Sequence, residues 1–254
     1  MADGDVSVAL TSPKAKISIL CDGNGDFVDI DSFTLSNSYT ISVWYYNKRP
    51  NADATTDYIF YSSVMYLSKK DTAGDQTLYR YRHKQAGGVD VLKDFNIPVG
   101  RAREWNHYIL TFDNTAGTMT IYLNGVYLDG AAAVGFLGFT EQPRLSFAGG
   151  SAADGMIGDF RCFTTSITAS QAANLYAGEI DTVLLSKLKV WLPLQKDYLD
   201  YSGNGLDGTN TNCRLGIWDT DVKKAITNVR TSIDDHQLIA MTANNQVINV
   251  NINE

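Results

Sequence analysis

Two short loops carry the oxygen-bearing side chains that hard cations prefer. The first contains Asp22 and Asp26, and the second contains Asp200, Asn204 and Asp207. Ca²⁺ takes about six to eight oxygen ligands, several of them carboxylates, and neither loop ends in the Glu of an EF-hand. Gly, Asn and Asp also form tight turns without a metal. The composition therefore leaves two interpretations open for each loop, a calcium site and a plain turn.

The first third of the chain is rich in tyrosine, whose ring can stack on a sugar or anchor a protein interface. The tyrosines there include Tyr45, Tyr46, Tyr58, Tyr61, Tyr66, Tyr79 and Tyr81, and the favoured ligand-binding rings among them are Tyr45, Tyr46, Tyr79 and Tyr81. Strand alternation places about half of such side chains in the core. The pattern does not separate the two groups, so a core role and a binding role stay open for each ring.

Sulfur and imidazole groups show no catalytic or metal-binding spacing. The cysteines Cys21, Cys162 and Cys213 lack a Cys-x-x-Cys pair, so we expect buried thiols and at most one disulfide. The histidines are His83, His107 and His236. They are isolated in the sequence, and structural roles are expected for them. Serine-hydrolase, zinc-protease, phosphate-loop and dinucleotide motifs do not occur.

The chain is acidic, with a net charge of −7 and a pI of about 4.9. An acidic surface repels nucleic-acid phosphate, so nucleic-acid binding is not expected. No apolar run approaches the roughly 20 residues that span a bilayer, and residues 1–7 lack the basic and apolar regions of a signal peptide. We expect a protein without membrane insertion, located on a virion or extracellular surface that it reaches without a cleaved signal.

Strand signals run through the chain, and one helix signal accompanies them. Residues 40–46 show the clearest strand alternation, and Asn124-Gly125 is a strong hairpin signal between two further strand patterns. Thr168 and Gln171 form a capping box, which predicts a helix over 169–177 closed by a glycine. The chain is therefore expected to be all-β with one short helix, which excludes folds built from alternating strands and helices.

Three groups of segments combine such strand and turn patterns in a particular order. They are Cys21-Asp-Gly-Asn-Gly-Asp-Phe-Val-Asp-Ile30 with Tyr39-Thr-Ile-Ser-Val-Trp44, Trp105-Asn-His-Tyr-Ile-Leu-Thr-Phe-Asp113 with Thr120-Ile-Tyr-Leu-Asn-Gly125, and Gly158-Asp-Phe-Arg-Cys-Phe163 with Ser166-Ile-Thr-Ala-Ser-Gln171 and Asn174-Leu-Tyr176. Together they resemble the laminin-G-like domains of the concanavalin A-like lectin/glucanase superfamily. The resemblance covers about residues 16–180. It implies a jelly-roll sandwich of two antiparallel sheets.

The C-terminal third departs from that resemblance. Residues 190–209 are similar to the segment that usually opens such a domain, yet here they follow it. We favour a circular permutation, in which these strands dock back onto the sandwich, over a truncated second copy, because an isolated strand pair is marginal in water. The expected parts are an N-terminal arm at 1–15, a sandwich at 16–220 with its core at 16–180 and completing strands at 188–220, and a C-terminal arm or added strand at 221–254.

Some enzymes of this superfamily are glucanases with a Glu-Ile-Asp-x-x-Glu strand motif, and retaining hydrolysis needs two carboxyl groups about 5 Å apart. This chain has Glu179-Ile-Asp-Thr-Val-Leu184, in which Leu184 replaces the second glutamate. The run also follows a predicted helix end instead of lying inside a strand. We therefore expect the protein not to be an enzyme.

Two functions fit these observations. The first is a non-catalytic structural or decorating protein of a viral or extracellular particle, which binds other structural proteins or copies of itself through its terminal arms. The second is a lectin-like carbohydrate-binding module used in adhesion, with or without calcium, whose partners are cell-surface or extracellular glycans. The missing export signal places the first ahead, whereas the family resemblance and the tyrosine content favour the second.

Overall fold

The structure is a computed structural model. It describes residues 17–35, 37–49, 55–73, 76–98, 104–217, 238–241 and 247–250. The chain divides into two compact units, Met1–Gly216 and Ile217–Glu254. In the second unit, β18 (Leu238–Met241) and β19 (Val247–Val250) form an antiparallel pair of their own. Apart from these two strands, both predicted terminal arms lie outside the described residues.

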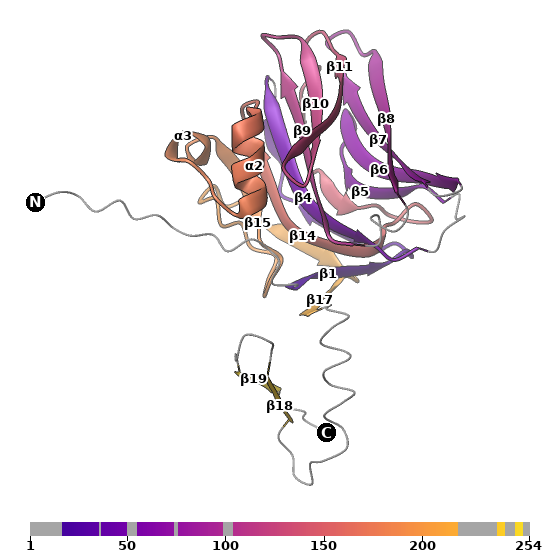
Figure 1. Cartoon of the computed structure of the whole chain (residues 1–254), viewed down its shortest axis with the longest axis vertical. Coiled ribbons are helices and arrows are strands. Elements are labelled where there is room, and N and C mark those ends of the chain that lie inside the picture. The colour runs from indigo at the N-terminus through magenta and orange to yellow at the C-terminus, as the bar shows by residue number, and fades with distance from the viewer. Residues whose placement is uncertain are drawn as a thin grey trace, which may run out of the picture. The chain divides into compact units, whose positions relative to one another are not determined.

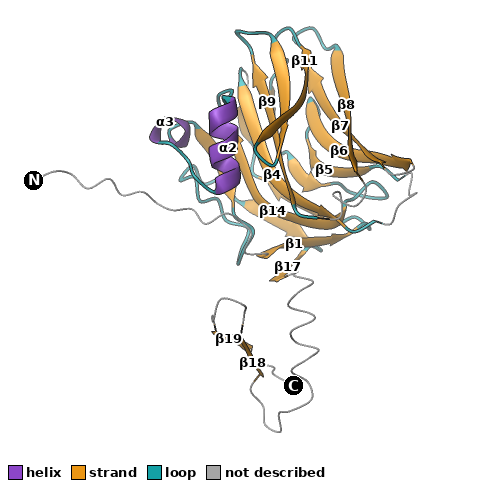
Figure 2. Cartoon of the chain, in the orientation of Figure 1, coloured by secondary structure: helices purple, strands orange, loops and turns teal. Residues whose placement is uncertain are grey.

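Two antiparallel sheets face one another in the first unit (Figures 1 and 2). The eight-stranded sheet, termed sheet A, has the order β11-β10-β9-β4-β14-β1-β17, and β15 also pairs with β14. Its strands are β1 (Ile17–Asp22), β4 (Tyr39–Asn47), β9 (Asn106–Asp113), β10 (Thr118–Leu123), β11 (Val126–Ala132), β14 (Asp154–Phe163), β15 (Leu188–Leu192) and β17 (Arg214–Ile217).

The seven-stranded sheet, termed sheet B, has the order β16-β2-β13-β5-β6-β7-β8. Its strands are β2 (Phe27–Ile30), β5 (Asp57–Tyr61), β6 (Met65–Ala73), β7 (Gln76–Lys84), β8 (Asp90–Pro98), β13 (Arg144–Ser146) and β16 (Gly208–Thr211). A separate short pair joins β3 (Phe33–Leu35) to β12 (Phe139–Glu141). The all-β sandwich predicted from the sequence is confirmed.

One helix was predicted, and the described residues contain two. Helix α2 (Ala169–Ala177) has the predicted bounds, and its N-cap Thr168 forms the complete capping box. The prediction of a single helix was wrong because α3 (Thr182–Leu185) has only four residues, too few for a periodic pattern. Helix α2 packs on the outer face of sheet A (Figure 2), where Leu175 joins Ile109 in a small apolar cluster.

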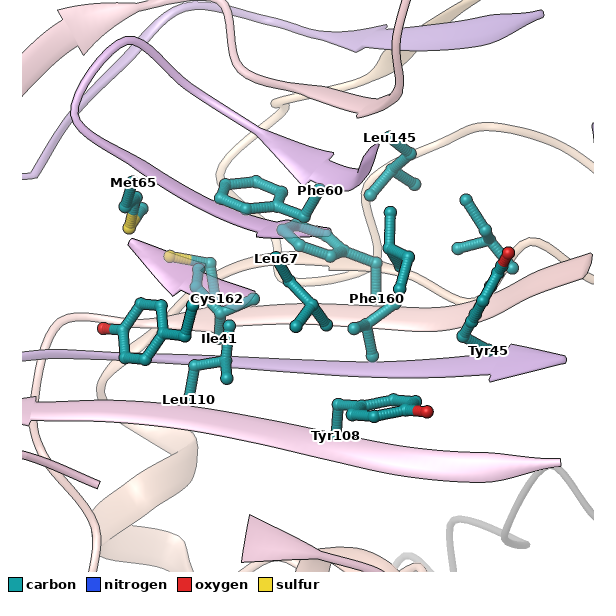
Figure 3. Close-up of a cluster of buried hydrophobic side chains, with 14 of the residues drawn as sticks. Ile41, Tyr45, Phe60, Met65, Leu67, Tyr108, Leu110, Leu145, Phe160 and Cys162 are labelled. Atoms are coloured by element: carbon teal, nitrogen blue, oxygen red, sulfur yellow. The ribbon is translucent and has the colours of Figure 1, made fainter. Parts of the chain in front are cut away.

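The core lies between the sheets and is built from large aromatic and aliphatic side chains (Figure 3). Phe60 of β5 stacks on Phe160 of β14 with their ring centroids 5.3 Å apart, and both side chains are fully buried. Other members of this core are Ile41, Met65, Leu67, Leu110, Leu145 and Cys162. Because the two phenylalanines come from opposite sheets, their contact joins the two layers.

The C-terminal strands of the first unit extend both sheets. Strand β15 pairs with β14 and β17 lies beside β1, both in sheet A. Strand β16 pairs with β2 at the edge of sheet B. Segments from the two ends of this unit therefore lie side by side in each layer.

Two histidines are buried within the fold. The Nε2 atom of His83 donates to the carbonyl oxygen of Gly135 at 2.8 Å, so its Nδ1 accepts the Tyr39 hydroxyl at 2.9 Å. His107 bonds through Nε2 to the Ser42 hydroxyl at 2.7 Å. Burial lowers the pKa of both imidazoles, that of His107 to about 3. Both histidines are structural, as the sequence indicated.

Replacing Phe160 with alanine should lower the free energy of unfolding by about 3–5 kcal/mol, because it leaves a cavity between the sheets. Urea denaturation followed by tryptophan fluorescence measures this loss. The matched control is Val126→Ala, whose side chain is 69% exposed on β11. That change should stay within about 0.5 kcal/mol of the parent. Equal losses in the two variants would contradict the assignment of the core.

Lowering the pH from 7.5 to 5.0 should destabilise the protein. The folded state keeps His107 neutral and disfavours protonation of His83, whereas the unfolded chain binds protons at both as the pH falls below about 6.5. His107 alone accounts for a loss of about 2 kcal/mol over this interval. Urea titrations at the two pH values measure it, and His107→Gln should remove much of the dependence. An unchanged pH dependence in that variant would show that the stability is lost elsewhere.

Candidate functional site

Four aromatic rings gather on the outer face of sheet B, which is turned away from sheet A. They are Tyr58 and Tyr61 on β5, Tyr66 on β6 and Phe147 just after β13. Ring centroids lie 4.6 Å apart for Tyr61 and Phe147, 5.0 Å for Tyr58 and Phe147, and 5.1 Å for Tyr58 and Tyr66. Tyr66 is 9% exposed, and the other three rings are half-buried. These four residues are termed the aromatic cluster.

A β-bulge in β5 places Tyr58 and Tyr61 on the same face. In a regular strand, residues three apart point to opposite faces. The pairing of β5 with β6 shifts between Tyr58 and Phe60, and the extra residue returns Tyr58 to the face of Tyr61. Phe60 and Leu67 point into the core. Tyr61 and Tyr66, which are direct cross-strand partners, therefore share the outer face.

Charged residues continue the aromatic cluster on both sides. Successive cross-strand partners over β2, β13, β5, β6 and β7 are Asp29, Arg144, Tyr61, Tyr66 and Arg82. Arg144 forms an ion pair with Asp29 at 2.8 Å. The Arg82 guanidinium carbon lies 5.6 Å from the centroid of the Tyr66 ring. Together these side chains form a continuous row across five strands.

The arginines of this face are each paired with a carboxylate. Arg80 donates to both carboxylate oxygens of Asp94 at 2.6 and 2.7 Å, and this hydrogen bonding lowers the pKa of Asp94. Arg82 pairs with Asp90 at 2.8 Å. The face thus offers hydrogen-bond donors and acceptors without a large excess of either charge. Aromatic faces flanked by such pairs suit a neutral ligand with many hydroxyl groups.

The structure corrects the choice of ligand-binding tyrosines at three of four positions. Tyr45, Tyr79 and Tyr81 are fully buried, so their rings belong to the core and present no face to a ligand (Figure 3 shows Tyr45). Tyr46 is half-buried and packs against Trp105 on sheet A, with ring centroids 6.0 Å apart. Tyr58, Tyr61 and Tyr66 of the aromatic cluster were among the tyrosines considered from the sequence but not among the four favoured, and Phe147 was not considered.

The sequence of β7 contains a pattern that predicts which of its side chains point into the core. Arg80 and Arg82 alternate with Tyr79 and Tyr81, and the charged pair takes the outer face because burying an unpaired charge is costly. The two tyrosines must then point inward. The bulge that assembles Tyr58 with Tyr61 has no such signal, because it depends on the pairing with β6.

The carboxylate of Asp200 is satisfied by hydrogen bonds from its own loop and from β15. It accepts the backbone N–H groups of Trp191, Ser202 and Leu206 and the Ser202 hydroxyl, at distances between 2.7 and 3.0 Å. Burial opposes ionisation of Asp200, but these hydrogen bonds prevail and lower its pKa. The carboxylate therefore organises the turn that follows β15.

The other predicted cation ligands are engaged in a similar way. Asp207 accepts the N–H of Asp200 at 2.8 Å, and the Asn204 amide donates to the carbonyls of residues 188 and 189. In the first loop, Asp26 accepts the N–H of Asp22 at 2.6 Å, and burial raises the pKa of Asp26. Across the described part of the chain, no three His, Cys, Asp or Glu residues are grouped as metal ligands. The carboxylates named here therefore already have hydrogen-bond partners, and a calcium site in either loop stays a prediction.

Comparison with known proteins supports the architecture. A family model described as the concanavalin A-like lectin/glucanases superfamily matches residues 22–173. A Bacteroides ovatus protein, described as a "putative carbohydrate binding protein", superimposes with a TM-score of 0.58 at 17% identity, covering 81% of this chain and 61% of that one. A comparison with curated proteins finds no match.

Two further solved structures share the fold. A heptameric SAP-like pentraxin of Limulus polyphemus has a TM-score of 0.54 at 12% identity, over 79% of this chain and 94% of the pentraxin. The binding domain of Paraclostridial Mosquitocidal Protein 1 has a TM-score of 0.52 at 14% identity, over 68% of this chain and 48% of that one. At these identities the likeness shows the fold alone. The chain also spans less than two thirds of the Bacteroides protein and of the mosquitocidal domain.

Calcium should leave the thermal stability unchanged, because the loop carboxylates are already satisfied by N–H groups. We expect melting temperatures in calcium and in a chelator to agree within about 1 °C, since a ligand that binds only the folded state raises them. Asp200→Ala should lower the free energy of unfolding by about 1–3 kcal/mol in both solutions. If calcium raises the melting temperature and Asp200→Ala or Asp26→Asn abolishes that rise, the loop binds calcium and this prediction is wrong. Scanning fluorimetry of the parent and both variants in the two solutions measures these melting temperatures.

Proposed function

The chain belongs to the concanavalin A-like lectin/glucanase superfamily, and we propose that it is a non-catalytic carbohydrate-binding module that uses the aromatic cluster of sheet B. The observation that carries this proposal is the position of Tyr58, Tyr61 and Phe147. Their rings are only partly covered, and they lie together on an outer sheet face instead of being dispersed. Grouped aromatic side chains with a polar rim are typical of a recognition surface.

The chemistry of a sugar matches this face. The C–H groups of a pyranose ring carry partial positive charge and pack on the electron-rich face of an aromatic ring. The row from Asp29 to Arg82 places guanidinium donors and carboxylate acceptors on both sides of the rings. Sugar hydroxyl groups use both kinds of partner. Because the arginines are paired with aspartates, we propose a neutral glycan as the ligand.

A binding role without catalysis is supported by the carboxylates beside the aromatic cluster and in the Glu179–Leu184 run. Glycoside hydrolysis requires a carboxylic acid with a raised pKa beside a second carboxylate. Near the cluster, Arg80 lowers the pKa of Asp94 instead. In the Glu179–Leu184 run, Asp181 serves as N-cap of α3 and accepts the N–H of Leu184 at 2.6 Å. Its carboxylate therefore has a structural role.

The alternative, a structural or decorating role on a particle, depends on the terminal arms. These lie outside the described residues apart from β18 and β19, so the assembly role and the self-association remain predictions. Within the described ranges, no helix has both the length and the apolar character to cross a membrane. The aromatic cluster, by contrast, gives glycan binding a defined surface.

Tyr61→Ala should abolish most glycan binding, because it removes the ring at the centre of the charged row. We expect the full-length protein to bind specific glycans on an array and the variant to lose at least about tenfold in affinity. Isothermal titration with the best glycan measures the change. Tyr58→Ala should have a similar effect.

Tyr127→Ala is the matched control, since this tyrosine is 61% exposed on β11 of the other sheet. It should bind as the parent does. The proposal fails if the parent protein binds no glycan, or if Tyr61→Ala and Tyr127→Ala bind equally well. Far-ultraviolet circular dichroism verifies that each variant is folded.

A further inference from the structure

Two of the three cysteines meet although they are 192 residues apart in the chain. Cys21 lies in β1, and Cys213 lies between β16 and β17. Their sulfur atoms are 3.6 Å apart, and the two side chains are 0% and 5% exposed. Cys162 lies elsewhere, on β14 opposite Ile41 and Val190. The fold therefore pairs two particular thiols from opposite ends of the sandwich.

The surroundings of Cys213 hold its backbone in place. Its carbonyl oxygen accepts the Tyr198 hydroxyl at 3.1 Å and the Asn210 side-chain amide at 3.0 Å, and its N–H donates to Thr211 at 2.9 Å. Asn212 has a φ of +61°, so the chain turns sharply just before the cysteine. These contacts fix the corner at which the chain passes from β16 of sheet B to β17 of sheet A.

We propose that Cys21 and Cys213 are a disulfide-forming pair that links the first strand of the sandwich to its last corner under oxidising conditions. A disulfide needs sulfur atoms about 2.05 Å apart and Cα atoms about 4.4–6.8 Å apart. Cys213 directly precedes β17, the neighbour of β1, and directly opposed residues on neighbouring strands meet the second condition. Small side-chain rotations can close the remaining distance of about 1.5 Å between the sulfurs.

The oxidant is a small disulfide such as oxidised glutathione. One protein thiol loses its proton and attacks the glutathione disulfide, which forms a mixed disulfide and releases one glutathione thiol. The second protein thiolate then displaces the other glutathione, so two protein thiols and one glutathione disulfide yield one protein disulfide and two glutathione thiols. The hydrogen bond to Cys213 and burial both raise the pKa of Cys21. Because exchange requires a thiolate, the reaction should be slow in the folded state.

The link would close a loop that spans nearly the whole sandwich. It would join β1 of sheet A to the segment that carries β16 along β2 of sheet B. Cross-links between distant residues restrict the unfolded chain most strongly. We expect the oxidised protein to melt about 5–10 °C above the reduced one. The C-terminal corner of the sandwich should also resist proteolysis better.

The experiment is a cysteine map of the full-length protein after oxidation. The protein is refolded from urea in a glutathione redox buffer, so that burial does not block exchange, then alkylated under denaturing conditions and digested with trypsin without reduction. Trypsin places each cysteine in its own peptide, at residues 17–48, 162–187 and 197–214. Mass spectrometry of the monomer band should show peptide 17–48 linked to 197–214 and the Cys162 peptide alkylated.

Two variants make the result decisive. Cys162→Ser should keep both the cross-link and the rise in melting temperature, whereas Cys213→Ser should lose both. The proposal is overturned if all three cysteines are alkylated after refolding, if the cross-link occurs only between two chains, or if glutathione adducts replace it. The outcome does not depend on glycan binding, so it is separate from the test of the proposed function.

Discussion

A buried ion pair in β14 lies at the point where the N-terminal and C-terminal strands of sheet A meet along this strand. Asp159 has a φ of +44° and interrupts the regular pairing of this strand between Gly158 and Arg161. Arg161 donates to both oxygens of the Asp159 carboxylate at 3.1 and 2.7 Å, and the Trp191 indole donates to one of them at 2.7 Å. Burying such charges is costly unless they are paired and hydrogen-bonded, and these three donors meet that requirement.

Because of the interruption at Asp159, β14 pairs with both an N-terminal and a C-terminal strand of the sandwich. Before it, β14 pairs with β1, and after it, β14 pairs with β15 on the same side. Trp191, which bonds to Asp159, belongs to β15 itself. The N–H of Asp159 also donates to the carbonyl of Pro193 at 3.2 Å. The C-terminal strands are therefore part of the sandwich, and the corner that carries Cys213 is brought beside β1.

Successive side chains of a strand point to opposite faces, so the same strands of sheet B supply both core residues and the outer face. Each residue that β7 sends inward, such as Tyr79, places a neighbour such as Arg80 outward. The inward rings fill the space between the sheets, and the outward arginines pair with aspartates of β8. The bulge at Tyr58 departs from this rule, and this departure assembles the aromatic cluster. A recognition surface beside a bulge is a frequent arrangement in β proteins.

Local signals in the sequence were sufficient for the fold class, most strands and helix α2, including the cap at Thr168. A capping box or a period of two residues depends only on near neighbours in the chain, so one sequence suffices to predict them. The choice among the tyrosines, the hydrogen bonds that fill Asp200 and the approach of Cys21 to Cys213 were decided by the tertiary structure. Each depends on strand register and on contacts between residues far apart in the chain, and a one-residue shift in pairing exchanges the buried and exposed faces of a strand.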